Sequence, residues 1–115
     1  MNSKIVFHEQ KMEIPVKTGF VARHYHELMY IVYDAPYCWL HFTGKTRYKV
    51  EVTLQYLMER LPKTTFFQCN RSAILNLHCY REYRKKDEMV VMDDGMELNL
   101  ARRRVNDFHD LRKNY

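Results

Sequence analysis

Glycine, proline and catalytic sequence motifs are all scarce in this chain. Its 115 residues include only three glycines and three prolines. There is no GxSxG nucleophile motif and no glycine-rich loop that could cradle a phosphate group. Acidic residues cluster only at Asp87-Glu88 and Asp93-Asp94, where turn chemistry explains them. We therefore expect no enzyme, no cofactor and no small-molecule substrate.

Cysteine is also sparse, and its pattern fits no disulfide framework and no zinc site. Cys38, Cys69 and Cys79 form an odd set without a CxxC pair, so we expect reduced thiols that serve packing. His24 and His26 are spaced to share one face of a strand, but no carboxylate or cysteine stands at a recognised zinc spacing. We expect no metal site, and a small histidine-based enzyme is the more distant alternative.

Long hydrophobic runs are missing as well. No segment approaches the roughly 20 apolar residues that span a bilayer, and the N-terminus lacks a signal-peptide core. These absences predict a cytoplasmic protein with no membrane partner. The length suits a single domain over residues 1–115. A net charge of +5 and a pI near 9.2 favour a polyanionic partner, although a solvated basic surface gives the same totals.

Strand-forming residues dominate what remains. The nine tyrosines, six phenylalanines and many β-branched residues favour short strands. Strands are predicted at residues 4–7, 12–17, 20–23, 28–33, 37–42, 47–52, 89–92 and 96–100. Pro15 predicts that its strand lies at a sheet edge, and Asp94-Gly95 predicts a hairpin turn.

Two helices are predicted within this β-rich scaffold. The first runs from Thr53, its N-cap, to Leu61, and Pro62 ends it. The second lies within residues 102–112 and places Val105, Phe108 and Leu111 against a sheet.

Residues 66–76 carry the most informative pattern. Asn70-Arg71-Ser72 interrupts two apolar runs that otherwise read as buried strand. Because an unpaired buried charge is costly, Arg71 is predicted to leave the sheet at a turn or bulge and point outward. One interpretation is a structural ion pair with an acid such as Glu51 or Glu82. The other is contact with an external anion or a base edge.

Two further loops complete a candidate footprint. Arg102, Arg103 and Arg104 stand at a helix start, where the helix dipole disfavours cations unless an external anion is present. A solvated helix start with some acid pairing is the alternative. The turn at residues 34–39 carries Tyr37 and Trp39, for which core packing competes with base stacking. If the three loops share one face, they form a nucleic-acid footprint.

These segments, taken in order, resemble the LytTR family of bacterial DNA-binding domains over about residues 12–112. The family pattern couples a phenylalanine to a Cys/Val-His-Arg-Ser stretch that ends in Val-Asn. Here Phe67-Gln68-Cys69-Asn70-Arg71-Ser72-Ala73-Ile74-Leu75-Asn76 follows that pattern, with Asn70 in place of histidine. Ala101 replaces the serine that the family commonly has before its arginines.

The resemblance implies a mainly β fold of small packed sheets, with one short helix between strands and a short C-terminal helix. It implies that loops enter successive major grooves of double-stranded DNA, with Arg71 in the central contact loop, Arg103 reading a base, and Tyr37 or Cys38 in the first contact loop. Asn70, Ser72, Arg102 and Arg104 are adjacent candidates for phosphates.

The resemblance further implies transcription regulation at direct repeats in promoters and a homodimer on DNA. Family members often carry a receiver domain, and we expect none here because few residues precede the match. The alternative function is a basic-faced protein-interaction module without base-specific DNA recognition.

Overall fold

The structure is a computed structural model that describes residues 4–114, so residues 1–3 and 115 of the predicted domain lie outside it. The strands are β1 (Val6–Phe7), β2 (Lys11–Val16), β3 (Gly19–His24), β4 (Leu28–Asp34), β5 (Tyr37–Phe42), β6 (Thr46–Val50), β7 (Phe66–Asn70), β8 (Ala73–Asn76), β9 (Tyr80–Arg84), β10 (Met89–Met92) and β11 (Glu97–Asn99). The helices are α1 (Leu54–Arg60) and α2 (Val105–Arg112), with 3-10 turns η1 (Tyr25–Glu27), η2 (Lys85–Asp87) and η3 (Arg102–Arg104).

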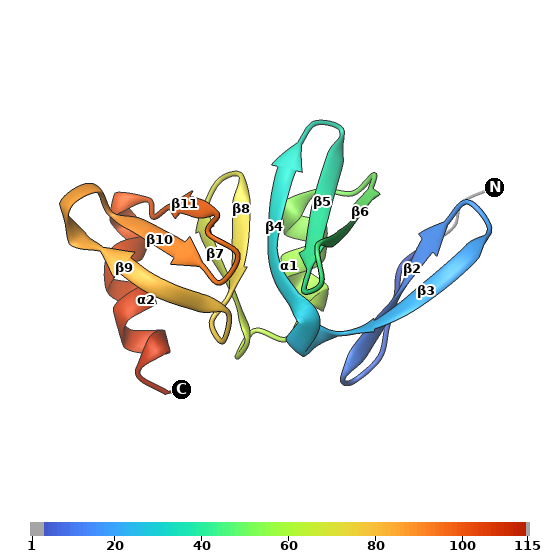
Figure 1. The fold of residues 1–115 in the computed structure, drawn as a ribbon, viewed down its shortest axis with the longest axis horizontal. Coiled ribbons are helices and arrows are strands. Elements are labelled where there is room, and N and C mark those ends of the chain that lie inside the picture. The colour runs from blue at the N-terminus through green and yellow to red at the C-terminus, as the bar shows by residue number, and fades with distance from the viewer. Residues whose placement is uncertain (1–3, 115) are drawn as a thin grey trace.

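Three antiparallel sheets make up the fold (Figure 1). The central sheet has five strands in the order β6-β5-β4-β8-β7. A sheet of order β1-β2-β3 and a sheet of order β11-β10-β9 lie at the two ends of the molecule. The expected mainly β class is confirmed, with α1 between strands and α2 at the C-terminus.

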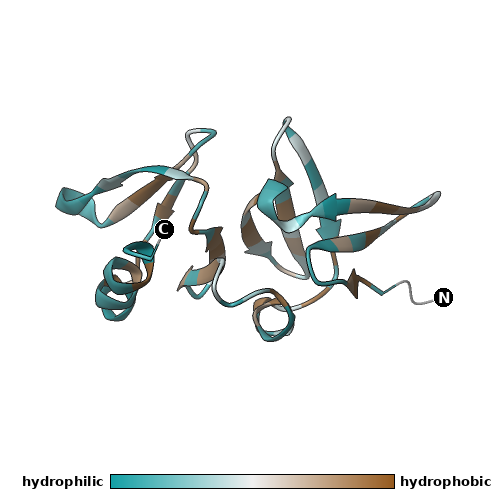
Figure 2. Cartoon of the chain, turned by 90° about the horizontal axis from the view of Figure 1, so that it is seen from below, coloured by the Kyte–Doolittle hydropathy of each residue, from teal (hydrophilic) through white to brown (hydrophobic). Residues whose placement is uncertain are grey.

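The central sheet separates two hydrophobic cores. Alternate residues of a strand face opposite sides, so Ile31 and Ile74 join one core while Tyr30 and Leu75 join the other. The first core packs β2 and α1 against the sheet, and the second packs β9–β11 and α2 against the other face. In Figure 2 the hydrophobic colour gathers within the strands, whereas α2 is largely hydrophilic apart from its inward side.

Several local predictions are confirmed by backbone and side-chain geometry. The Thr53 hydroxyl accepts a hydrogen bond from the Tyr56 backbone N–H at 3.0 Å, and the helix ends before Pro62. Gly95 has a φ of 92°, which a residue with a side chain rarely adopts, and it allows the tight turn between β10 and β11. All three cysteines are free and buried.

Two strand predictions need correction. Pro15 does not mark an edge strand, because β2 lies in the middle of its sheet. The proline is tolerated since β1 pairs only with Met12 and Glu13, which leaves the β1 side of Pro15 unpaired. Strand β9 was not predicted, because its sequence Tyr-Arg-Glu-Tyr-Arg is too rich in charge to read as a strand.

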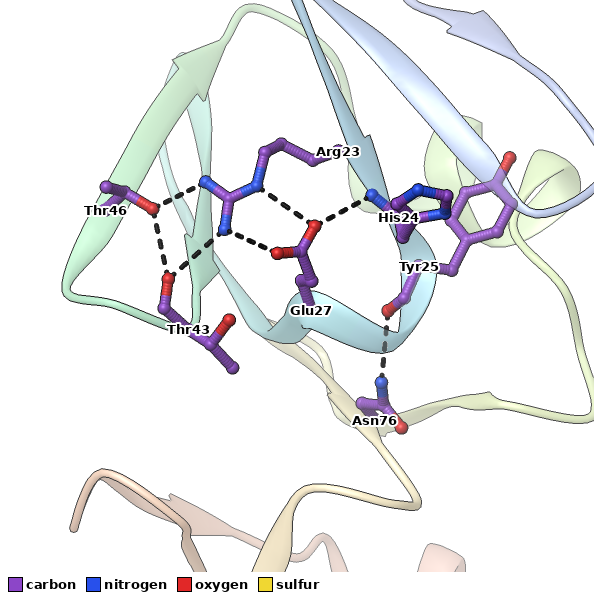
Figure 3. A network of polar contacts seen from close by, with 7 residues as sticks. All are labelled: Arg23, His24, Tyr25, Glu27, Thr43, Thr46 and Asn76. Atoms are coloured by element: carbon purple, nitrogen blue, oxygen red, sulfur yellow. Dashed lines mark hydrogen bonds and ion pairs between the residues drawn. The ribbon is translucent and has the colours of Figure 1, made fainter.

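Asn76 ties the start of β4 to the end of β8 at the buried lower end of the central sheet (Figures 1 and 3). Its side-chain amide donates to the backbone carbonyls of Leu28 at 2.9 Å and Tyr25 at 3.3 Å. Its side-chain oxygen accepts from the His78 backbone N–H at 2.8 Å. The asparagine that closes the family-like pattern therefore has a structural role.

A second network beside it fixes the path from β3 into β4 (Figure 3). The Arg23 guanidinium donates to the Glu27 carboxylate and to the Thr43 carbonyl, and its hydrogen bonds hold the pKa of Glu27 below its ordinary value. Farther along the chain, the Tyr30 hydroxyl donates to the Asp94 carboxylate at 2.7 Å and joins the β10–β11 turn to the central sheet.

Candidate nucleic-acid interface

The three predicted contact loops lie next to one another and are joined by backbone hydrogen bonds. The β4–β5 and β7–β8 turns stand side by side at the upper edge of Figure 1, because β4 and β8 pair directly. The Tyr33 backbone N–H donates to the Ser72 carbonyl at 2.8 Å and locks the two turns together. The third loop is attached by the Ala101 N–H, which donates to the Cys69 carbonyl at 2.9 Å. The expectation that these loops share a face agrees with this arrangement.

Arg71 stands at the tip of the β7–β8 turn and is exposed, as its sequence context predicts. The strand register shifts between Gln68 and Asn70, so the chain leaves the regular ladder just before it. Within residues 4–114, Arg71 forms no ion pair and no hydrogen bond through its side chain. The structural interpretation, an ion pair with Glu51 or Glu82, is therefore wrong.

Asn70 shapes this turn from within. Its amide nitrogen donates to the Asn99 carbonyl at 2.6 Å, and its side-chain oxygen accepts from the Ser72 backbone N–H at 2.7 Å. Both polar ends of the side chain are therefore used inside the protein. Asn70 therefore positions Arg71 and links β7 to β11.

The three consecutive arginines differ sharply from one another. Arg102 and Arg103 are exposed, and their side chains form no hydrogen bond or ion pair with any described residue. Arg104 is half-buried: its guanidinium donates to the Gln68 carbonyl at 2.9 Å, lies over the Phe67 ring at 4.9 Å and pairs with Asp107 at 3.6 Å. Arg104 thus fastens the C-terminal helix to β7, and its partners leave it little capacity for a phosphate.

Arg71 and Arg103 meet in one concave site. A hollow of about 230 Å³ is lined by Gln68, Asn70, Arg71, Ala101, Arg103 and Arg104. No carboxylate belongs to this lining, so the two free guanidinium groups have no internal counter-charge. Guanidinium groups donate paired hydrogen bonds in a fixed plane, which suits phosphate oxygens and the acceptor edge of guanine.

The family described as the LytTr DNA-binding domain matches residues 19–113, which is most of the chain. This chain belongs to that family. Comparison with the curated proteins finds no match.

A solved structure shares the LytTr fold. It is the LytTr DNA-binding domain of a putative methyl-accepting/DNA response regulator from Bacillus cereus, with a TM-score of 0.77. The match covers 90% of this chain and 97% of that one, at 19% sequence identity. The TM-score supports the shared fold. At this low sequence identity, the roles of individual residues are argued from this chain's own geometry.

In the predicted first contact loop, Tyr37 reaches the surface and Cys38 does not. Cys38 has no exposed surface, and its thiol donates to the Val52 carbonyl at 3.2 Å. Burial raises the pKa of Cys38 to about 11, so the thiol stays protonated within the core. Tyr37 is half-buried beside the Ala35-Pro36 turn and remains available at the surface. Ser72 is half-buried, and its hydroxyl has no hydrogen bond with a described residue.

Replacing Arg104 by alanine is expected to lower the free energy of unfolding by about 1 to 2 kcal/mol, because the Gln68 carbonyl loses a charged donor. Replacing the neighbouring Arg102 removes the same charge from an exposed position and should change stability by less than about 0.5 kcal/mol. Urea unfolding of both variants measures the difference. Equal stability of the two variants would contradict the structural role of Arg104.

The sequence patterns did not single out Arg47 and Lys49 as candidate site residues of the LytTr domain. Both stand on β6, where the alternation of Thr46–Val50 places them on one face, opposite Val50. Arg47 lies over the Trp39 ring at 4.6 Å, and Lys49 lies over the Tyr37 ring at 4.5 Å. The alternation of exposed cations along β6 can be recognised in the sequence. The contacts of these cations with aromatic rings of β5 cannot, because they depend on the register of the two strands.

Residues 4–114 contain no group of three or more histidine, cysteine or acidic side chains that could hold a metal ion. The His24 and His26 rings stack on each other with centroids 5.3 Å apart. None of the helices described is long and apolar enough to cross a membrane.

Proposed function

We propose that this LytTr domain binds double-stranded DNA at specific sequences and thereby regulates transcription. The observation that carries the proposal is the meeting of two uncompensated arginines, Arg71 and Arg103, in one concave site without a carboxylate. A protein that only stabilises its own fold gains nothing from two such groups held together. A polyanion supplies the missing counter-charge.

Arg103 is the proposed base-reading residue. Its guanidinium can donate two parallel hydrogen bonds to the O6 and N7 acceptors of guanine in the major groove. Arg71, on the adjacent turn, supports a neighbouring contact. Arg102 is exposed beside them and suits a phosphate, which would fix the register of the protein on the duplex.

The shape of the molecule supports contact with more than one groove. Its longest extent is 45 Å, and successive major grooves on one side of a duplex are separated by about 34 Å. We propose that the loops enter successive major grooves and that two copies occupy direct repeats in a promoter as a homodimer on DNA. The role of a response-regulator output domain belongs to the same proposal.

Replacing Arg103 by alanine should weaken binding to a selected site by about 1 to 3 kcal/mol and relax the preference at one base position. The measurement is a titration of labelled duplexes that carry every single-base change in a site selected from a random pool. Retained preference at every position in Arg103→Ala would contradict the base-reading role.

Two controls separate specific recognition from charge alone. Arg102→Ala should weaken binding to all duplexes by similar factors, because a phosphate contact carries no sequence information. Wild-type protein should prefer the selected duplex over a scrambled one at physiological salt. Binding without that preference would favour the alternative function, a basic surface for an acidic protein partner.

A further inference from the structure

On one face of the central sheet, two of the five strands, β5 and β6, contribute no residue to a core. Strands β9–β11 and helix α2 cover β4, β8 and β7 on that face, and the second core contains no residue of β5 or β6. The inward residues of β5, namely Cys38, Leu40 and Phe42, all belong to the first core on the opposite side. The outward residues of β5 and β6 therefore form an open surface.

Cations on this open surface are held in place by aromatic rings. We name it the β5–β6 patch and define it by Lys17, Tyr37, Trp39, Arg47 and Lys49. Arg47 lies 4.6 Å from the centre of the Trp39 ring. Lys49 lies 4.5 Å from the Tyr37 ring and 5.9 Å from the Trp39 ring. The rings restrict both flexible side chains, so less conformational entropy is lost when they bind.

Within residues 4–114 the cations of the patch form no direct ion pair, and two acids, Asp93 and Asp94, line a separate hollow with Arg47. Arg47, Lys49 and Lys17 are exposed. Asp34 and Glu51 are the exposed acids next to the patch in sequence, and neither pairs with these cations. Elsewhere the chain does compensate its charge: Arg84 pairs with both Asp87 and Glu97 at about 3 Å.

A groove extends the patch to the tip of the β2–β3 hairpin. Its lining consists of Pro15, Val16, Lys17, Trp39, Arg47, Tyr48 and Lys49, with three cations and no carboxylate. The patch adjoins the proposed DNA surface, because Tyr37 belongs to both. Lys49 stands opposite Trp39 in the register of β5 and β6, and Trp39 lies two residues along β5 from Tyr37. The charge and this continuity both fit the phosphates of a duplex that already lies across the loops.

We propose that the β5–β6 patch holds the sugar–phosphate backbone of DNA that flanks the bases read by the loops. This inference rests on the proposed function and adds a second, sequence-independent contact to it. Arg47 and Lys49 supply the charge, and Trp39 and Tyr37 hold them in position. The patch sets how tightly any duplex is bound, whereas Arg71 and Arg103 set which duplex is preferred.

The salt dependence of binding tests the charge contacts. Each phosphate neutralised on duplex DNA contributes about 0.9 to the slope of log affinity against log salt concentration. The double variant Arg47→Gln/Lys49→Gln should reduce that slope by about 2 and weaken selected and scrambled duplexes by equal factors. Lys63→Gln/Lys113→Gln is the matched control, because these exposed lysines follow α1 and α2 in the chain and belong neither to the patch nor to the proposed contact loops.

Trp39 gives a direct reading of the patch because it is the only tryptophan in the chain. A selected duplex with flanking base pairs should change Trp39 fluorescence, since phosphates then lie beside the ring and its two cations. A duplex trimmed to the bases read by the loops should leave the emission unchanged. Circular dichroism of each variant verifies that it is folded.

The possible results separate the two proposals. An unchanged slope in the double variant, together with retained sequence preference in the wild type, overturns the patch alone. A reduced slope in a protein without sequence preference overturns the proposed function and supports a non-specific patch. Absence of duplex binding by the wild type overturns both.

Discussion

Replacing Phe108 by alanine is expected to lower the free energy of unfolding by about 3 to 5 kcal/mol, the range found for buried phenylalanines. Phe108 is fully buried on α2 and contacts the rings of Phe67, Tyr80 and Tyr83 with centroids 5.5 to 6.0 Å apart. Its removal leaves a cavity where the helix meets both sheets. Urea unfolding followed by circular dichroism measures the loss.

The same substitution should also affect DNA binding, because α2 follows directly from the segment that carries Arg103. We expect affinity to fall in proportion to the unfolded fraction and to recover at lower temperature if the variant remains partly folded. Asn106→Ala, an exposed change on the same helix, is the control. A loss below about 1 kcal/mol for Phe108→Ala would contradict the central place of this residue in the second core.

Replacing Asn76 by alanine is expected to cost about 2 to 4 kcal/mol, because several buried polar groups lose their partner. The carbonyls of Tyr25 and Leu28 and the N–H of His78 would all be left without the asparagine. Thermal and urea unfolding measure the loss. Asn99→Ala is the control, because the Asn99 side chain is exposed and only its backbone carbonyl is used.

An Asn76→Asp variant adds a pH test of the same site. A carboxylate there faces two carbonyl oxygens and is buried, so its pKa should rise above that of an unfolded aspartate. A raised folded pKa makes the variant most stable relative to the wild type at low pH, and that stability is lost as the pH rises through the folded pKa. A deficit that stays constant between pH 4 and pH 7 would contradict the hydrogen-bonding scheme.

Features that depend on neighbouring residues could be predicted from the sequence. The Thr53 cap, the stop at Pro62 and the Gly95 turn are set by local backbone chemistry and appear where they were expected. Arg71 was also placed correctly at an outward turn, because burying an unpaired guanidinium is too costly. Strand β9 was missed because its register, rather than its composition, makes it a strand.

The candidate site was less predictable, because side-chain partners come from distant parts of the chain. Asn70 is separated from Asn99 by 29 residues, and Arg104 from Gln68 by 36 residues. Their polar side chains suggested surface contacts, whereas the fold uses them to hold β7, β11 and α2 together. Cys38 was placed in a contact loop by resemblance, but the alternation of β5 turns it into the core.

Backbone hydrogen bonds join the proposed contact loops to one another, in addition to the side-chain bonds of Asn70 and Arg104. The Tyr33 N–H to Ser72 carbonyl bond and the Ala101 N–H to Cys69 carbonyl bond do not involve the side chains at positions 71 and 103. Replacing Arg71 and Arg103 by other residue types should therefore change which bases are preferred while leaving the spacing between contacted bases intact. Under the proposed function, target choice and target spacing would then change independently, and randomising these two positions would redirect the domain to new sites.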